Sequence, residues 1–318
     1  MSYQIVSRMM CRKSVFLSVA VAGATFLSAS GLARTLLVGP ERELKAPSDA
    51  AVLVNDGDTI LIDPGSYADC AIWRANNLTI EGEGDVTLRD RVCQDKAIFV
   101  ITGSDTTIRN IAFAHARSTS KNGAGIRSEG ANLTIENSHF VDNEDGILTS
   151  GNPQSRIIIR NSVFTENGKC ESDCAHGIYI GRIALLEVSH STFFQQYAGH
   201  HIKSRAQRTE ITGNIIRDGA AGTASYEVDI PDGGSLVLRD NVIEKGAHAG
   251  NKFAAVTIGE ESNANPTGEL IIDHNTFDND NSATTTFVRN RTATMAELSG
   301  NVIHGRAVAF SGPGHLLP

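Results

Sequence analysis

The sequence contains few aromatic residues and has a deficit of positive charge. Phe, Trp and Tyr make up 6% of the 318 residues, and Trp occurs once. This scarcity argues against a propeller with recurrent aromatic positions, and against a groove that binds neutral sugars mainly by stacking. The formal net charge is −8. We therefore expect no nucleic-acid partner, because such binding depends largely on neutralising phosphates.

Residues 95–305 contain no sustained helical pattern of apolar residues at i, i+3 and i+4. Apolar and polar residues alternate instead, which is typical of strands. A repeat is also visible: an aliphatic residue, a small polar residue three places on, and Phe or Ile two places further, as in NLTIENSHF (132–140). The polar positions lie 23 to 34 residues apart, at Ser138, Ser162, Ser191, Asn214, Asn241, Asn275 and Asn301.

Repeats of this length indicate a solenoid, a propeller or an array. Short strands, Gly/Asn turns and a column of small polar residues favour a parallel β-solenoid, in which stacked Asn side chains satisfy buried turn amides. The pattern resembles the right-handed parallel β-helix of pectate-lyase-like proteins. We predict an all-β, single-domain, monomeric protein of this fold over residues 51–305, with an N-terminal cap over 34–50 and a C-terminal tail over 306–318.

The first 33 residues have the pattern of a secretory signal peptide. Arg8, Arg12 and Lys13 precede a long apolar run, and small residues lead to a cleavage site after Ala33. We expect export to the periplasm or the extracellular space, with no stable membrane insertion after cleavage. An uncleaved membrane anchor is the alternative. Cleavage would remove three positive charges and leave a net charge of −11.

Four cysteines follow the predicted signal peptide. An even number in an exported chain favours two disulfides. Of the three possible pairings we favour Cys70–Cys93 and Cys170–Cys174. The CESDC stretch (170–174) has no histidine partners at zinc-finger spacing, which argues against a zinc site there.

A second series of strands brings reactive groups together. If Ile178, Ile202 and Val228 point inward, alternation sends the residues after them to the outer face, and those before them as well. Coils of a solenoid lie about 4.8 Å apart, so Tyr179, Lys203 and Asp229 should form a row. This arrangement predicts a dense polar patch on the outer face, with these members: Arg127, Tyr179, His201, Lys203, Arg205, Glu227 and Asp229.

Two stretches within this patch resemble known enzymes. IKSRAQRTEITGN (202–214) looks like the lysine-bearing strand of β-helix alginate lyases, and the analogy falls on Lys203. HGIYIG (176–181), followed by a strand that ends in Ser204 and Arg205, is similar to mannuronan C5-epimerases, and that analogy falls on Arg205. The Asp-Pro-His-Asp motif of the epimerases is absent, as is a clear match for the second catalytic arginine of the lyases.

Elimination across a uronic acid requires a neutralised carboxylate and a base. We hypothesise that Lys203 and Arg205 hold the carboxylate, while Tyr179 or His201 handles the proton. The alginate-lyase resemblance would instead make Lys203 the base. The prediction is a polysaccharide lyase for an acidic glycan, with these further residues contacting substrate: Arg127, His176, His200, Tyr226, Glu227 and Asp229.

Other functions fit the same residues. A C5-epimerase shares the proton abstraction, and a hydrolase would use Glu227 and Asp229 as its carboxylate pair. A non-catalytic solenoid that binds glycans or has a structural role would use the row as a surface ion-pair ladder.

No cofactor is predicted, although the carboxylates of VDNEDG (141–146) leave calcium possible beside the ordinary interpretation of a repeat turn. His176 and His200 can hydrogen-bond the backbone, contact substrate or bind a metal.

Overall fold

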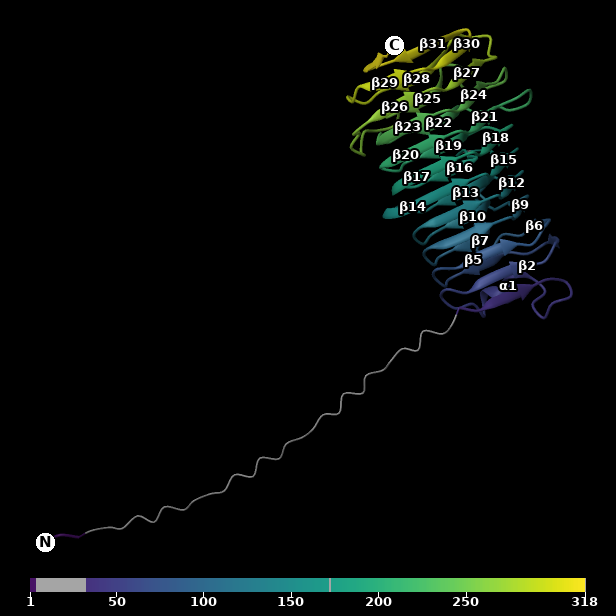
Figure 1. Ribbon diagram of the computed structural model, residues 1–318, viewed down its shortest axis with the longest axis vertical. Helices are drawn as coiled ribbons and strands as arrows, with labels where there is room; N and C mark the ends of the chain where they lie inside the picture. The colour runs from purple at the N-terminus through teal and green to yellow at the C-terminus, as the bar shows by residue number, and fades with distance from the viewer. Residues whose placement is uncertain (4–32, 172, 318) are drawn as a thin grey trace. The chain divides into compact units, whose positions relative to one another are not determined.

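Short parallel strands make up nearly all of the regular structure from Ala33 onward. The computed structural model describes residues 1–3, 33–171 and 173–317, so most of the predicted signal peptide lies outside the described residues. The strands form three parallel sheets, and from the second strand onward consecutive strands of the chain belong to different sheets. The chain therefore winds as a parallel β-helix, with the coils stacked along its axis (Figure 1).

Sheet A has 12 strands. They are β1 (Thr35–Val38), β2 (Thr59–Ile62), β5 (Thr79–Gly82), β8 (Thr106–Arg109), β11 (Leu133–Glu136), β14 (Asn152–Arg160), β17 (Ile183–Ser189), β20 (Arg208–Thr212), β23 (Ser235–Arg239), β26 (Leu270–Asp273), β29 (Ala296–Ser299) and β32 (Gly314–Leu316).

Sheet B has 10 strands. They are β3 (Gly65–Tyr67), β6 (Val86–Arg89), β9 (Ala112–Ala114), β12 (His139–Val141), β15 (Val163–Thr165), β18 (Thr192–Phe194), β21 (Ile215–Arg217), β24 (Val242–Lys245), β27 (Thr276–Asn279) and β30 (Val302–Gly305).

Sheet C, which carries the predicted patch, also has 10 strands. They are β4 (Ala71–Trp73), β7 (Ala97–Ile101), β10 (Ala124–Ser128), β13 (Asp145–Thr149), β16 (Ile178–Ile180), β19 (His200–Ser204), β22 (Tyr226–Ile230), β25 (Ala254–Ile258), β28 (Thr285–Asn290) and β31 (Ala307–Ser311).

The segments outside the predicted solenoid also join it. Within residues 34–50, β1 is the first strand of sheet A, and the short helix α1 (Pro47–Ala51) places Ala50 in the hydrophobic core. Residues 306–318, expected to be a tail, contain β31 and β32, which extend sheets C and A. Among the residues that the structure describes, no helix has both the length and the apolar character to cross a membrane.

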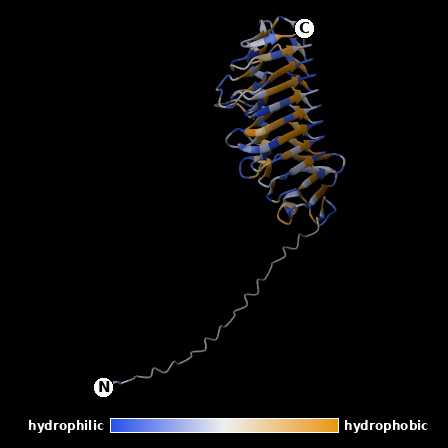
Figure 2. Ribbon diagram, turned by 60° about the vertical axis from the view of Figure 1, so that its left-hand side comes forward, coloured by the Kyte–Doolittle hydropathy of each residue, from blue (hydrophilic) through white to orange (hydrophobic). Residues whose placement is uncertain are grey.

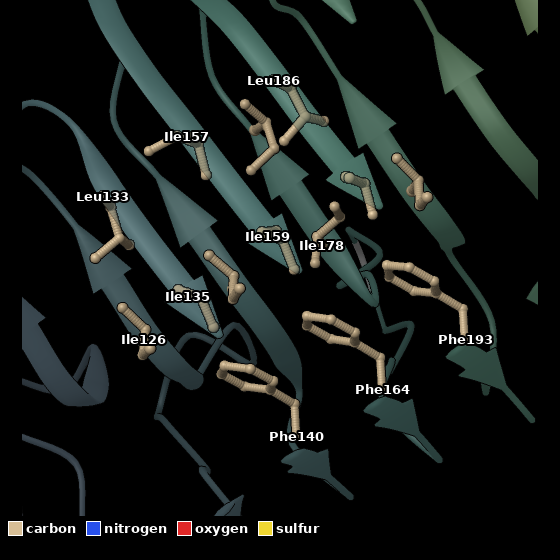
Figure 3. Packing of buried hydrophobic residues seen from close by; sticks show 14 of the residues in the cluster. Ile126, Leu133, Ile135, Phe140, Ile157, Ile159, Phe164, Ile178, Leu186 and Phe193 are labelled. Carbon is tan, nitrogen blue, oxygen red and sulfur yellow. The ribbon is translucent and has the colours of Figure 1, made fainter. Parts of the chain in front are cut away.

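The repeat columns of the sequence become vertical stacks in the core. Phe140, Phe164 and Phe193 occupy equivalent positions on neighbouring strands, and their rings stack with centroids 4.6 and 4.5 Å apart (Figure 3). Figure 2 shows the apolar residues following the strands from coil to coil. In the polar column each side-chain oxygen accepts a backbone N–H of the coil before it, for example Asn241 Oδ1 from Asn214 N at 2.9 Å. The predicted all-β, parallel solenoid is confirmed.

Two disulfides close loops beside sheet C. Cys70 bonds to Cys93, with Cα atoms 5.5 Å apart, and Cys170 bonds to Cys174. Both predicted pairings are confirmed.

One part of the predicted alternation is wrong. Ile178, Ile202 and Val228 do point into the core, but so do the residues immediately before them. The ladder between β19 and β22 pairs His200 with Tyr226 and then Ile202 with Val228, passing over His201 and Glu227. Alternation requires a straight strand, and the coil bends into sheet C at this position. His201 and Glu227 therefore lie inside the solenoid rather than on the outer face.

Glycine fills the same inward position on earlier coils. A Cβ added at Gly125 would lie 2.8 Å from the ring of Phe140, and one added at Gly146 would lie 2.9 Å from the ring of Phe164. The phenylalanine stack thus occupies the space that a side chain would need. On the next two coils the equivalent residues of sheet B are Ile216 and Ile243, and the inward position of sheet C is taken there by the buried side chains of His201 and Glu227.

Candidate functional site

The outer face of sheet C carries the predicted row. Tyr179 on β16 pairs in register with Lys203 on β19, and Lys203 pairs with Asp229 on β22. Arg127 on β10 and Leu148 on β13 continue the same row in the other direction. Lys203 Nζ lies 3.3 Å from Asp229 Oδ2. The expected adjacency of phenol, ammonium and carboxylate is confirmed.

A carboxylate outside the repeat joins Lys203 of this row to Arg205, which follows the end of β19. Glu261 Oε1 accepts from Lys203 Nζ at 2.7 Å, and Glu261 Oε2 accepts from Arg205 Nη2 at 2.6 Å. Burial alone would raise the pKa of Glu261, but these two hydrogen bonds hold it below its ordinary value. The Glu261 side chain is nevertheless 47% exposed. Lys203 and Arg205 therefore form a carboxylate-binding pair that is open to solvent on one side.

The loop of residues 259–269, which follows β25, carries Glu261. Its backbone is fastened to the end of β22, where Glu261 N and Ser262 N both donate to Pro231 O. Asn265 Nδ2 reaches the end of β19 and donates to Arg205 O at 3.0 Å. The loop thus holds Glu261 against the two cations from a position far along the chain.

Arg205 connects the carboxylate-binding pair to the phenol. Its Nε donates to Tyr179 Oη at 2.9 Å, and its Nη1 donates to Asp232 Oδ1 at 2.7 Å. Burial lowers the pKa of Arg205, but the hydrogen bonds to Glu261 and Tyr179 outweigh it and leave the pKa above its ordinary value. A single charged guanidinium therefore faces a carboxylate and the Tyr179 oxygen together.

The cations are not in excess within this cluster. Asp229, Asp232 and Glu261 accompany Lys203, Arg205 and the more exposed Arg182, which pairs with Asp232 at 2.8 Å. Asp232 and Glu261 lie outside the strands, so strand alternation in the sequence could not place them in this cluster.

Three aromatic rings stack beside the row. The rings of His176, His200 and Tyr226 have centroids 4.8 and 5.1 Å apart. His176 Nδ1 accepts from His200 N, and His200 Nδ1 accepts from Tyr226 N, so both imidazoles hydrogen-bond the backbone. Burial lowers the pKa of His176 to about 3, with help from nearby Lys203 and Arg205, and lowers that of His200 as well. Both histidines are therefore neutral at neutral pH.

His200 contacts the row through one carboxylate. Its Nε2 lies 3.4 Å from Asp229 Oδ2. Burial raises the pKa of Asp229 to about 6 although Lys203 opposes the rise. Asp229 is thus held between an imidazole and an ammonium, with 2% of its surface exposed.

A pocket of about 460 Å³ opens over the N-terminal part of the row. Arg127, Leu148 and Tyr179 belong to its lining, and the walls include residues 120–122 and 173–175. Asp145 also lines it, 1% exposed, and burial raises the pKa of this carboxyl to about 8. A pocket of about 540 Å³ lies elsewhere, between sheets A and B around Asn110 and His139, and no Lys or Arg lines it.

His201 and Glu227 belong to a separate cluster inside the solenoid. His201 Nε2 lies 3.2 Å from both Asp218 Oδ1 and Glu227 Oε2, and the three residues have the mutual spacing of metal ligands. Lys245 Nζ, also fully buried, lies 3.2 Å from Glu227 Oε1. Lys245 supplies a buried positive charge beside the two acids, which favours an ion-pair cluster over a divalent cation.

These positions correct two predictions. His201 cannot handle a substrate proton, because it is 1% exposed and faces the interior. The hydrolase interpretation based on Glu227 and Asp229 is wrong as well, because the two carboxylates lie on opposite sides of β22.

The carboxylates considered for calcium point to different partners. Asp142 Oδ1 binds Arg117 Nη2 at 2.5 Å, Glu144 Oε2 accepts from Ser118 N and Gly123 N, and Asp145 Oδ1 accepts from His176 N. Within residues 141–146 these side chains therefore do not share one coordination point.

Comparisons with known proteins agree with this architecture. The family model described as "Right handed beta helix region" matches residues 44–195. No curated protein matches the chain. Among solved structures, ORF18 of Geobacillus virus E2 is 11% identical with a TM-score of 0.54, over 82% of this chain and 54% of that one.

The pectate lyase Pel9A is 13% identical with a TM-score of 0.52, over 89% of this chain and 81% of the lyase. An alginate lyase from Paenibacillus sp. str. FPU-7 is 14% identical with a TM-score of 0.46, over 89% of this chain and 99% of that one. The chain spans about half the length of the viral protein. It is a right-handed parallel β-helix protein. Its fold is similar to that of the pectate lyase, as the repeat predicted.

Proposed function

We propose that this protein is an exported polysaccharide lyase that cleaves an acidic, uronate-containing glycan by β-elimination. The observation that carries the proposal is that the carboxylate of Glu261 is bound by Lys203 at 2.7 Å and by Arg205 at 2.6 Å. The same Arg205 guanidinium also donates a hydrogen bond to Tyr179 Oη. A uronate carboxylate that displaced Glu261 would meet the same two cations. Its acidic C–H would then lie on the side of the phenol.

The two cations suit the first requirement of elimination. Removing the proton next to a carboxylate builds negative charge on that carboxylate, and positioned cations stabilise such charge strongly in a site with little water. Lys203 Nζ also contacts Asp229, so it faces two carboxylates, those of Asp229 and Glu261. We therefore assign Lys203 to carboxylate binding rather than to the role of base.

Tyr179 is the proposed group that removes the proton. Its oxygen accepts from Arg205 Nε, so the guanidinium stabilises negative charge on that oxygen. In the proposed step the Tyr179 phenolate takes the C–H proton, the electrons of the C–H bond form the C=C bond, and the glycosidic C–O bond breaks. The departing oxygen takes a proton from Tyr179 or from Asp145, which burial keeps protonated at neutral pH.

Export remains part of the proposal. Two disulfides in the described residues suit an oxidising compartment, where such bonds persist. Residues 1–33 have the sequence pattern of a secretory signal peptide, which directs export. We expect an acidic polysaccharide as the partner.

The experiment is incubation of the protein and of Lys203→Met with a panel of acidic polysaccharides, following the ultraviolet absorbance of the unsaturated product and chain length together. A lyase gives both a new chromophore and shorter chains, and both disappear in Lys203→Met. Altered sugar composition without cleavage would indicate an epimerase. Binding without any chemical change on every polymer would contradict an enzyme and indicate a glycan-binding solenoid.

A further inference from the structure

The pocket over β10, β13 and β16 contains a cation, Arg127, that has no closely bound counter-ion among the described residues. Arg127 Nε is buried and has no hydrogen-bond partner among the residues that the structure describes. The Arg127 guanidinium approaches Glu129 Oε1 only to 3.6 Å, and that oxygen already accepts from Lys96 Nζ at 2.6 Å. Asp145, which lines the same pocket, is protonated at neutral pH and supplies no countercharge.

The floor of the pocket has the composition of a sugar subsite. Leu148 lies between Arg127 and Tyr179 in the row and is 7% exposed, so it offers a small apolar surface beside two polar groups. The pocket volume of about 460 Å³ lies within the usual range for small-molecule sites. Lys121 and Asp173 lie at the walls of the pocket and carry opposite charges. The net charge of the pocket lining is therefore set by Arg127.

Arg127 and Lys203 lie three strands apart in one row. At about 4.8 Å per strand, their backbones are separated by roughly 14 Å. That distance is longer than one sugar ring. A glycan that reaches both cations must therefore run along the solenoid axis and cover several residues.

We propose that the pocket around Arg127 is a second carboxylate subsite, which makes the ligand a polyuronate with acidic units at both ends of the Arg127–Lys203 row. This inference rests on the proposed function, because it takes the Lys203–Arg205 pair as the first carboxylate site. It predicts that affinity rises in a step once an oligouronate is long enough to reach from one site to the other.

The test uses size-defined oligogalacturonates and oligomannuronates, with binding measured by calorimetry on the full-length protein and on Arg127→Gln. The step should appear with the wild type and vanish with Arg127→Gln, with a loss of roughly ten-fold for the longer oligomers. The shortest oligomers should bind both proteins equally. Arg127→Lys, which keeps the charge, should retain part of the step, and Lys121→Gln at the wall should change it little.

Binding that is independent of oligomer length, or equal for wild type and Arg127→Gln, overturns the inference, as does failure of both series to bind. Thermal unfolding of each variant distinguishes a lost contact from a damaged fold. Failure of the proposed function is visible separately, because it removes the ultraviolet product while leaving these binding curves unchanged.

Discussion

Glu261 Oε1 lies 2.7 Å from Lys203 Nζ although the two residues are 58 positions apart in the sequence. The same carboxylate reaches Arg205, so the protein occupies its own carboxylate-binding pair. A substrate must therefore compete with an internal group that is already in place, and the apparent affinity is reduced accordingly.

Removing this competitor should tighten substrate binding. We expect Glu261→Ala to lower KM several-fold, because Lys203 and Arg205 would no longer be occupied. Stability should fall by less than about 1 kcal/mol, since Glu261 is half exposed. Glu260→Gln is the matched control, because the carboxylate of Glu260 pairs with Arg289 and Arg291 instead of Lys203 and Arg205. A rise in KM in Glu261→Ala would show instead that Glu261 itself contacts substrate favourably.

Tyr179→Phe should separate chemistry from binding. The variant keeps the ring that packs edge-on against His176 at 5.2 Å but loses the oxygen that faces Arg205. A proton-transfer group contributes roughly 10²–10⁴-fold to rate, so kcat should fall by that factor with KM nearly unchanged. Tyr197→Phe, at an exposed tyrosine, is the control. Full activity in Tyr179→Phe would remove the phenol from the mechanism.

The Cys170–Cys174 disulfide should matter more for the pocket than for stability. Cys174 and its neighbours Asp173 and Ala175 line the pocket over Arg127. We expect Cys170→Ala/Cys174→Ala to raise KM for long substrates. The control Cys70→Ala/Cys93→Ala opens the longer loop, with a separation of 23 rather than 4 residues.

Loop-closure entropy gives the control pair about 3 kcal/mol of stabilisation and the pocket pair about 2 kcal/mol. The control should therefore lower the midpoint of thermal unfolding more and raise KM less. Equal KM values in the two double variants would show that the disulfide loop does not shape the pocket.

Asp145 should make stability depend on pH in a defined direction. Burial raises the pKa of Asp145 from 3.8 to about 8, so the folded protein retains a proton that the unfolded chain releases. Stability therefore falls as the pH rises through this window, because the folded state binds more protons than the unfolded state. Asp145→Asn cannot titrate and keeps an oxygen for His176 N–H.

Chemical denaturation at the two ends of this window measures the difference. We expect the wild type to lose stability relative to Asp145→Asn as the pH rises, by more than about 1 kcal/mol. His176, with its pKa lowered to about 3, acts in the opposite sense, since its contribution is lost as the pH falls below 6.5. A wild-type-minus-variant difference that is flat across the window would mean that Asp145 is ionised in the folded protein.

The part of the site that repeats was predictable from the sequence, and the part that does not repeat was not. Tyr179 and Lys203 could be placed side by side because each follows an inward aliphatic residue at the same point of its coil. Glu261 lies in a loop between repeats, where periodicity carries no register. His201 was assigned to the wrong face because strand alternation fails at the bend into sheet C.

Substitution of Asn241 tests whether the column of buried polar residues stabilises the stack of coils. Asn241 Oδ1 accepts from Asn214 N at 2.9 Å, and its Nδ2 donates to Ile211 O and Asn275 Oδ1, all in the buried interior. Asn241→Ala leaves these groups without their partner, and each unsatisfied buried group costs about 1–3 kcal/mol. We expect a loss of several kcal/mol in chemical denaturation.

Asn241→Ser is the matched variant, because serine occupies the same column on earlier coils. There Ser191 Oγ accepts from Ser162 N at 3.1 Å, so a hydroxyl can receive the backbone N–H of the preceding coil. The serine variant should therefore lose less stability than the alanine variant. Equal losses would mean that the volume of the asparagine, and not its hydrogen bonds to the neighbouring coils, stabilises the stack.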